Sequence, residues 1–345
     1  MTMLKIANWN VEWMNRWFTA DSAGAPQLRR SEEVDGVSDL PGLCGRVAAV
    51  IDTMAADIVA LQEGPSRKSE MALFVEQFLG DGYEIYGPAG KGQQKLYALI
   101  KRSSTAVADI SRITVEHGLD FEDDWDVDID RDLLLDRYGF TRPPLVLRIT
   151  SSHGRDFRLI NLHAKSKYVH QGERLWRDPL RREEYLREAL EARRRISAEA
   201  MRVREYLDLC FADDEQAALA VVGDFNDGPG FDYFEKRYLT HGLANTLAGS
   251  PYIPPRMLRH GFVDEMPKEL NWTAVFDDFI EEVENRKILL DHILLSASLY
   301  WNAGVRASAG LIEHDIFNAQ VREDLPGERE KLPSDHRPQS VTLQL

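Results

Sequence analysis

The chain has 345 residues, 43% of them hydrophobic and 29% charged, which is enough for one large domain or two ordinary ones. Its net charge of −15 argues against a protein that coats nucleic acid non-specifically, because such binding depends on contacts from lysine and arginine to phosphate. No apolar run reaches the ~20 residues of a membrane span, no signal-peptide pattern is present, and the two distant cysteines exclude a disulfide scaffold, so we expect a cytoplasmic protein with no obligate protein partner.

The first third of the chain alternates strand-like and helix-like patterns. Apolar residues at steps of three and four predict helices at 46–55 and 68–79. The segment 15–43 mixes glycine, proline, aspartate and serine without periodicity, so we predict a loop there. Short apolar runs predict strands at 4–10, 57–62, 83–86 and 96–101, the last two paired as a hairpin.

A strongly acidic segment occupies residues 116–136. Its alternating aspartates suggest a calcium-binding loop at first sight. The glycine that such a loop requires at its sixth position and the glutamate at its twelfth are both absent. We therefore predict a solvated surface excursion rather than a cation site.

The second half of the chain combines apolar strands with one long helix. A narrow apolar stripe predicts the helix at 185–207, and arginines dominate its flanks. These arginines favour a solvated outer face on a helix that packs against a sheet; the alternative is that some of them face a substrate entrance. Strands are predicted at 145–150, 157–162, 218–223, 288–296 and 339–345.

One stretch, Ala220-Val-Val-Gly-Asp-Phe-Asn-Asp-Gly-Pro-Gly230, ends an apolar strand with two polar side chains. Residues two apart in a strand face the same side, so Asp224 and Asn226 should project together. A carboxylate beside a core is costly unless a metal or a substrate uses it. The alternative is a turn in which both side chains bond their own backbone.

Polar residues also lie at the ends of other predicted strands. Carboxylates, amides and imidazoles together are the ingredients of a hard-cation site with acid–base partners. The chain has no cysteine cluster or His-Glu-x-x-His that would indicate zinc, and no Gly-x-Ser-x-Gly of a serine hydrolase. The candidate residues are Asn10, Glu12, Glu63, His163, Asp224, Asn226, Asp291, Asp335 and His336.

The order of these motifs resembles that of the endonuclease/exonuclease/phosphatase superfamily of deoxyribonuclease I-like phosphoesterases. The resemblance runs from residue 4 to residue 345. It implies an α/β fold, a four-layer sandwich of two mostly antiparallel mixed sheets packed face to face and flanked by helices. We expect a single domain over 1–345, with insertions near 15–43, 116–142 and 164–210. The matching pieces are WNVE (9–12), LQE (61–63), NLHAKS (161–166), GDFND (223–227), LDHILLS (290–296) and SDHRP (334–338).

The resemblance implies a metal site. Asn10 and Glu63 match positions that hold a divalent ion, Mg²⁺ or Mn²⁺, with Glu63 as the direct ligand. Asp335 would support the same ion. Glu12 lies where some members have an acidic residue behind the ligands.

The resemblance also implies catalytic residues. Asp224 and Asn226 match the pair that orients the attacking water and binds a phosphoryl oxygen. His336 would contact the phosphate and relay a proton, with Asp291 orienting its imidazole. His163 matches a position that is histidine in the deoxyribonuclease and sphingomyelinase branches and tyrosine in many abasic-site endonucleases, which argues against a dedicated abasic-site enzyme.

Other polar residues near the motifs are candidates for substrate contact. Arg142 precedes a strand in an Arg-x-Pro-like element, and Lys165 and Lys167 follow His163; a solvated role for the lysines is the alternative. His292 should face away from Asp291 along the strand and is interpreted as structural. His314 lies in an apparent loop and has no assigned role.

Three functions remain open. A metal-dependent phosphodiesterase or nuclease that cleaves DNA or another nucleic acid is the first. A phosphatase or phosphodiesterase acting on a small-molecule or lipid phosphate is the second, and the acidic net charge favours it. A non-catalytic binding protein on the same fold is the third, and it is disfavoured because Glu63, Asp224, Asn226 and His336 are all present.

Overall fold

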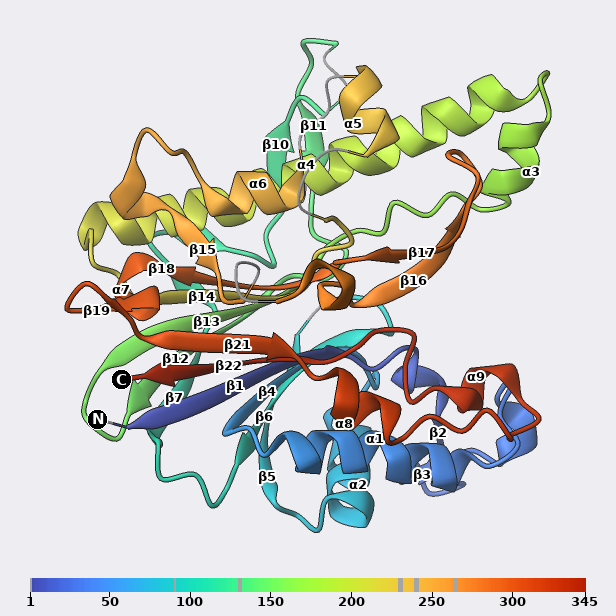
Figure 1. Ribbon diagram of the computed structural model, residues 1–345, viewed down its shortest axis with the longest axis horizontal. Coiled ribbons are helices and arrows are strands. Elements are labelled where there is room, and N and C mark those ends of the chain that lie inside the picture. The colour runs from blue at the N-terminus through green and yellow to red at the C-terminus, as the bar shows by residue number, and fades with distance from the viewer. Residues whose placement is uncertain (1, 90, 130–131, 229–231, 239–241, 263–265) are drawn as a thin grey trace.

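Two six-stranded β-sheets lie face to face at the centre of the computed structural model, with helices on their outer faces (Figure 1). The structure describes residues 2–89, 91–129, 132–228, 232–238, 242–262 and 266–345. A core of aliphatic side chains fills the space between the sheets. The four-layer sandwich expected from the sequence is therefore confirmed.

The first sheet has the strand order β21-β22-β1-β4-β6-β5. Its β1–β4 pair is parallel, and its other pairs are antiparallel. The strands are β1 (Met3–Asn10), β4 (Ile58–Gly64), β5 (Tyr83–Ala89), β6 (Lys95–Lys101), β21 (Ser308–Ile312) and β22 (Gln339–Gln344).

The second sheet has the order β15-β18-β14-β13-β12-β7. Here β13 and β14 are parallel, and the other pairs are antiparallel. The strands are β7 (Val107–Ile113), β12 (Leu145–Ser151), β13 (Asp156–His163), β14 (Leu219–Asp224), β15 (Leu258–His260) and β18 (Asp291–Ser296).

Amphipathic helices cover the outer face of each sheet. On the first sheet lie α1 (Leu40–Met54) and α2 (Lys68–Phe78), which bury apolar side chains against it. On the second sheet lie α4 (Arg182–Asp213) and α6 (Leu243–Ala248). Figure 1 shows α4 above the second sheet and α1 and α2 below the first. The part of the predicted stripe from Ile196 to Leu207 packs on the second sheet, which agrees with the interpretation of a packed outer helix. Tyr185 and Ala189, at the start of the stripe, pack in a separate cluster with Phe234.

Short helices and two-stranded ribbons lie in the connections between the main elements. None of the described helices is both long and apolar enough to cross a bilayer. The short helices are η1 (Met14–Arg16), η2 (Ser31–Glu33), α3 (Gly172–Arg177), α5 (Tyr233–Tyr238), η3 (Pro254–Arg256), η4 (Lys268–Leu270), α7 (Ala297–Tyr300), α8 (His314–Asn318) and α9 (Glu328–Lys331). The two-stranded ribbons are β2–β3 (Phe18–Ala20, Pro26–Leu28), β8–β9 (Val115–Glu116, Leu119–Asp120), β10–β11 (Trp125–Val127, Asp136–Tyr138), β16–β17 (Ala274–Asp278, Val283–Ile288) and β19–β20 (Trp301–Asn302, Val305–Arg306).

Three predictions from the sequence need correction. The strand predicted at 288–296 is two strands, because β17 ends at Ile288 and β18 begins at Asp291. The edge strand β7 was not predicted, since its exposed face leaves only a weak apolar pattern. The predicted loop 15–43 contains a ribbon, two 3-10 helices and the first turn of α1.

The acidic segment 116–136 is anchored rather than wholly solvated. Leu119 and Phe121 are buried in the core beneath α4. The Glu116 carboxylate accepts hydrogen bonds from Arg158 Nε at 2.7 Å and from Tyr206 Oη at 2.6 Å. The expected surface excursion is therefore wrong for its first residues; Asp130 and Arg131 lie outside the described residues.

The two sheets bring parallel strand ends to one edge. Gly223 makes this possible, because β13 and β14 approach so closely that a Cβ there would lie 1.8 Å from the carbonyl oxygen of Leu162. Its φ of 149° also lies in a region that other residues rarely adopt.

We predict that Gly223→Ala destabilises the fold by more than the ~1–3 kcal/mol of backbone strain alone, because the clash with Leu162 adds to it. Urea unfolding measures the difference as a lower midpoint at unchanged slope. Gly154→Ala is the matched control, since its φ is 77° but no atom lies within 4 Å of the added Cβ. Equal losses in the two variants would contradict the close-approach argument.

Glu116 should give a pH-dependent contribution to stability. Burial opposes its ionisation, but the bonds from Arg158 and Tyr206 outweigh burial and lower its pKa from 4.5 to about 2. The stabilisation is therefore complete above pH ~4.5 and is lost as the pH falls towards 2. The unfolding midpoints of the wild type and Glu116→Gln should differ at pH 7 and converge in acid. Replacement of the exposed Glu215 by Gln should show no such convergence.

Candidate functional site

The candidate residues meet where the two sheets share an edge. Strands β1, β4, β13 and β14 all finish at this edge, because each sheet contains one parallel pair. Strand β18 runs antiparallel to β14 and therefore begins there, with Asp291 paired to Asp224. The chain also enters β22 at this edge. Topology thus collects Asn10, Glu63, His163, Asp224, Asp291 and His336, as the sequence predicted.

Asp224 lies at the centre of the site and is almost fully buried. Its Oδ2 accepts a hydrogen bond from Asn10 Nδ2 at 2.9 Å, which joins the second sheet to the first. The same oxygen lies 3.5 Å from His163 Nε2 and 3.9 Å from His336 Nε2. Burial, opposed by His336, raises the pKa of Asp224 to about 7. This carboxyl group can therefore exchange a proton near neutral pH.

His336 is held by a second carboxylate. Its Nδ1 lies 2.7 Å from Asp291 Oδ2, so Nε2 is directed towards Asp224. The Asp291 backbone N–H donates to Thr273 Oγ1 at 3.2 Å, and Trp9 Nε1 donates to the His336 carbonyl at 2.9 Å. Burial opposes protonation of His336, but Asp291 and Asp224 outweigh it and raise the histidine pKa well above its usual value. The expected Asp291–His336 pair is present.

His163 has the opposite electrostatic character. It is buried at the end of β13, and burial, together with Arg142 and His336, lowers its pKa well below the usual value. Its Nε2 lies 3.8 Å from Glu63 Oε1. Its buried Nδ1 has no hydrogen-bond partner among the described residues. A neutral imidazole facing two carboxylates can serve as a hydrogen-bond donor through Nε2.

Glu63 is positioned by a left-handed backbone conformation and by two donors. Its φ is 57°, which turns the side chain out of β4. Its Oε2 accepts from the Trp13 N–H at 2.8 Å and from Gln94 Nε2 at 2.5 Å. Its Oε1 has a weaker neighbour, Asn10 Nδ2 at 3.4 Å. One carboxylate oxygen is therefore fixed by the protein, and the other faces the site.

Gln94 was not predicted from the sequence. Besides bonding Glu63, its Oε1 accepts from Arg142 Nη1 at 2.9 Å. It precedes β6 in a glycine-rich loop without periodicity, so no sequence signal marked it. Trp13 and Thr273, which support Glu63 and Asp291 respectively, were missed for the same reason.

Asn226 lies beyond the end of β14, in the turn that the sequence offered as the alternative. Its φ is 51°, and its N–H donates to Asp224 Oδ1 at 2.8 Å, which is the turn that the sequence left open. Its Nδ2 nevertheless points to the site edge, where it donates to the Ala164 carbonyl at 3.1 Å. Pro229 and Gly230 of the predicted turn lie outside the described residues.

Glu12 and Asp335 form an acidic pair at the rim. The Asp335 N–H donates to Glu12 Oε2 at 2.8 Å, and Arg329 Nε lies 3.1 Å from Glu12 Oε1. Burial and the nearby Asp335 raise the pKa of Glu12 to about 7, against the effect of Arg329. The Asp335 side chain remains 59% exposed, so it is free to turn towards a ligand in the site.

The structure places Arg142 behind the site. Its guanidinium donates to the carbonyls of His163 at 3.3 Å and Ala164 at 2.9 Å, as well as to Gln94. These contacts commit the side chain to holding the backbone after β13, which differs from the expected direct contact with substrate. The Lys165 N–H donates to the buried Glu199 at 2.8 Å, and the Lys165 side chain is partly exposed.

Lys167 is enclosed by carboxylates, so its ammonium group is already paired within the protein. Its Nζ lies 2.5 Å from Asp227, 3.2 Å from Asp232 and 3.0 Å from Glu235. Around these charges lies an aromatic cluster in which Tyr185 of α4 contacts side chains from three other segments. Its members include Val169, Trp176, Tyr185, Phe234 and Phe279.

The remaining candidate histidines are structural. His292 Nε2 lies 2.7 Å from the Asp227 carbonyl, and its Nδ1 lies 3.1 Å from His260 Nε2. His314 begins α8, and its Nε2 lies 2.7 Å from the Leu270 carbonyl. The interpretation of His292 from strand alternation agrees with these contacts.

The donor set fits a hard divalent cation. Carboxylates outnumber cationic groups at this edge, and the Asp291 Oδ1 is buried without a hydrogen-bond partner among the described residues. Asp224, Asp291 and His336 also bring ligand atoms within 4.8 Å of one another, but the Asp291–His336 hydrogen bond already occupies two of these groups. The Asn10 Oδ1 already accepts from the Glu12 N–H at 3.0 Å, so Asn10 acts mainly as a donor to the carboxylates. Oxygen-rich sites of this kind suit Mg²⁺ or Mn²⁺.

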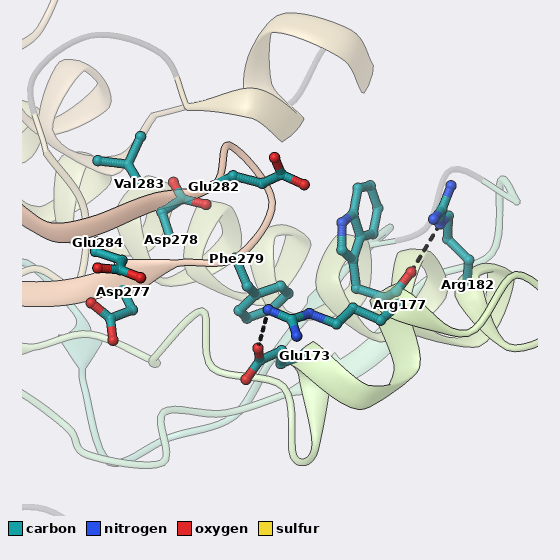
Figure 2. Close-up of a pocket in the computed structure, with 10 residues that line it drawn as sticks. Glu173, Arg177, Arg182, Asp277, Asp278, Phe279, Glu282, Val283 and Glu284 are labelled. Carbon is teal, nitrogen blue, oxygen red and sulfur yellow. Dashed lines mark hydrogen bonds and ion pairs between the residues drawn. The ribbon is translucent and has the colours of Figure 1, made fainter.

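A separate pocket of about 570 Å³ lies between α3 and the β16–β17 ribbon (Figure 2). Figure 2 shows Asp277, Asp278, Glu282 and Glu284 on the ribbon side and an ion pair between Glu173 and Arg177 on the helix side. None of the candidate site residues lines this pocket. We therefore assign the site to the shared edge of the sheets.

Comparisons with known proteins identify the fold. No protein-family model and no curated protein sequence match the chain. Among solved structures, truncated Caenorhabditis elegans TDP2 has a TM-score of 0.55 and 14% identity over 99% of this chain and 98% of that one. D. rerio TDP2 complexed with a single-strand DNA product has a TM-score of 0.51 and 14% identity, with both chains fully covered. The human Nocturnin catalytic domain with bound sulfate has a TM-score of 0.50 and 14% identity over 99% and 94% of the two chains.

These similarities extend over essentially the whole chain at low identity, so they establish its architecture. The chain has the four-layer α/β fold of these solved structures, which is the fold that the resemblance of its motifs implied.

Proposed function

We propose that the protein is a divalent-metal-dependent phosphoester hydrolase, and that it acts as a phosphodiesterase or nuclease on nucleic acid. The observation that supports this most directly is the buried Asp224 carboxylate, which lies between two imidazoles and shares the neighbours Asn10 and His163 with Glu63. Hydrolysis of a phosphoester needs a base for water and donors for the phosphoryl oxygens. This arrangement supplies both.

The residues divide into a base and donors. Asp224 accepts the proton of the attacking water, for which a pKa of about 7 suits it. His336, with its pKa raised well above the usual value, donates to the phosphate through Nε2, while Asp291 holds Nδ1. His163 and Asn226 donate to the remaining phosphoryl oxygens.

Glu63 and Asp335 would hold the metal, and Asn10 would orient the Glu63 carboxylate. When bound, Mg²⁺ or Mn²⁺ neutralises charge on the phosphoryl oxygens and stabilises the leaving oxygen. Gln94 and the Trp13 N–H keep the second oxygen of Glu63 occupied, so Oε1 is the oxygen that would hold the cation.

Nucleic acid is the first choice of substrate because one similar structure, D. rerio TDP2, holds a single-strand DNA product. A small-molecule or lipid phosphate is the second choice, and the net charge of −15 favours it, since an acidic surface weakens non-specific binding to polynucleotides. We also propose a cytoplasmic location, which is compatible with Cys44 and Cys210 being buried and free.

We predict that Asp224→Asn lowers kcat about 10²- to 10⁴-fold, because the general base is lost. The assay is nicking of supercoiled plasmid with Mg²⁺, compared with EDTA. Asp35→Asn, a change of the same kind at an exposed aspartate, is the matched control and should leave the rate unchanged. An intact plasmid with folded wild-type protein would reject the nuclease, and small phosphomonoesters and lipid diesters would be tested next.

The metal site gives a prediction that does not depend on the substrate. Glu63→Gln should abolish tight Mn²⁺ binding, and Gln94→Ala should weaken it about 10- to 100-fold, because Gln94 orients the ligand. Electron paramagnetic resonance of free Mn²⁺ measures both. The neighbouring Gln93→Ala, at an exposed side chain, is the control. Unchanged affinity in Glu63→Gln would place the ion elsewhere.

A further inference from the structure

An exposed tryptophan lies at the rim of the site. Trp13 keeps 41% of its surface exposed and lies three residues after the end of β1. Both it and Glu12 adopt left-handed backbone conformations, with φ of 54° and 46°. Residues other than glycine adopt this conformation at a cost, and two in succession are uncommon. The chain therefore uses unfavourable backbone geometry to place a large apolar ring in solvent.

The strained turn is fixed by residues of the site itself. The Trp13 N–H donates to Glu63 Oε2 at 2.8 Å. The Glu12 carboxylate is held by Arg329 Nε at 3.1 Å and by the Asp335 N–H at 2.8 Å. The backbone of Trp13 is therefore bonded directly to Glu63, the carboxylate that we assign to the metal. This bond fixes the position of Trp13 relative to the site.

The indole already has a stacked partner. The Arg16 guanidinium lies 3.9 Å from the ring centroid, and no carboxylate within the described part of the chain forms an ion pair with Arg16. An arginine that stacks on an aromatic ring restrains the ring and adds positive charge beside it. Positive charge without an acidic partner is uncommon near this site, where carboxylates are in excess.

We propose that Trp13, backed by Arg16, is a stacking platform for a planar aromatic ring that the substrate carries next to its scissile phosphate. The ring is a nucleobase of an unpaired strand or the aryl group of an aryl phosphodiester. Aromatic side chains bind unpaired bases by stacking without reading their sequence. This inference rests on the proposed phosphoesterase function and selects aromatic phosphodiesters over sugar or lipid phosphates.

The chain contains a matched control for this site. Trp301 is 38% exposed, and Arg259 lies 5.9 Å from its ring centroid. It follows β18 and α7, so it lies at the opposite end of the second sheet from Asp291, as Figure 1 shows for β19. Trp301→Ala removes an exposed tryptophan of the same kind without touching the site.

The experiment measures binding and hydrolysis separately. Fluorescence anisotropy in EDTA gives the affinity for a labelled single-stranded oligothymidylate and for a strand of abasic deoxyribose phosphates of the same length. Wild-type protein, Trp13→Ala, Trp13→Phe and Trp301→Ala are compared. Hydrolysis of the thymidylate strand and of methyl 4-nitrophenyl phosphate is then measured with Mg²⁺, and urea unfolding checks each variant.

We expect Trp13→Ala to weaken thymidylate binding about 5- to 100-fold and abasic binding little, with Trp13→Phe near wild type and Trp301→Ala unchanged. An effect confined to KM for methyl 4-nitrophenyl phosphate would also support the platform and would assign the ring to an aryl alcohol. Equal losses on both strands without an aryl effect, or no loss in Trp13→Ala, would overturn it. A base preference in binding without any hydrolysis would refute the phosphoesterase and leave the platform standing.

Discussion

The hydrogen bond from Asn10 Nδ2 to Asp224 Oδ2 connects the two sheets at the site. Burial of the Asp224 carboxylate in an apolar core would be unfavourable without partners, and the surrounding groups supply hydrogen bonds and charge that stabilise it. His336 supplies positive charge, Asp291 fixes His336, and the Asn226 N–H occupies the other oxygen of Asp224. Because each sheet contributes part of this arrangement, a relative shift of the sheets would expose or isolate the carboxylate. The chemistry of the site and the packing of the sandwich are therefore parts of one constraint.

A second polar contact between the sheets is made by residues one or two positions before the candidate residues on the same strands. Gln62 of β4 donates to Asn8 of β1 at 2.9 Å and to Asn161 of β13 at 2.7 Å. Asn161 in turn donates to the carbonyls of Leu61 at 3.2 Å and Tyr97 at 3.0 Å in the first sheet. Buried amides of this kind have few alternative partners, so they disfavour other registers between the sheets. An apolar core alone would tolerate small sliding motions, whereas this layer defines the spacing at the end where the candidate residues meet.

Sequence reasoning identified elements and residues that a local pattern marks. It missed residues whose role depends on contacts that only the fold creates. Alternation and apolar runs predicted the central strands. The polar residues at the ends of β1, β4, β13 and β14 could also be recognised, because each directly follows or ends an apolar run. Gln94 and Thr273 had no such mark, because their roles depend on which loops the topology places beside Glu63 and Asp291. Lys167 was misjudged for a related reason: its three acidic partners are 60 to 68 residues away along the chain. The position of a charged residue beside a candidate catalytic motif therefore shows only that it lies near the motif along the chain. Which acidic groups the fold places around it determines whether it is available to a substrate.

The enclosed ammonium of Lys167 has a consequence for how such a protein could change its substrate. It binds acidic residues of the segment that follows Asp224, while its own segment follows His163, and the aromatic cluster around Tyr185 packs the same segments together with the tip of the β16–β17 ribbon. These contacts connect the segments that follow β13 and β14 to each other and to the ribbon. Substitutions within the cluster could therefore move the segments after β13 and β14 while the strand ends stay in place. For directed evolution, this cluster is therefore a place to vary the loops without changing the candidate residues at the strand ends.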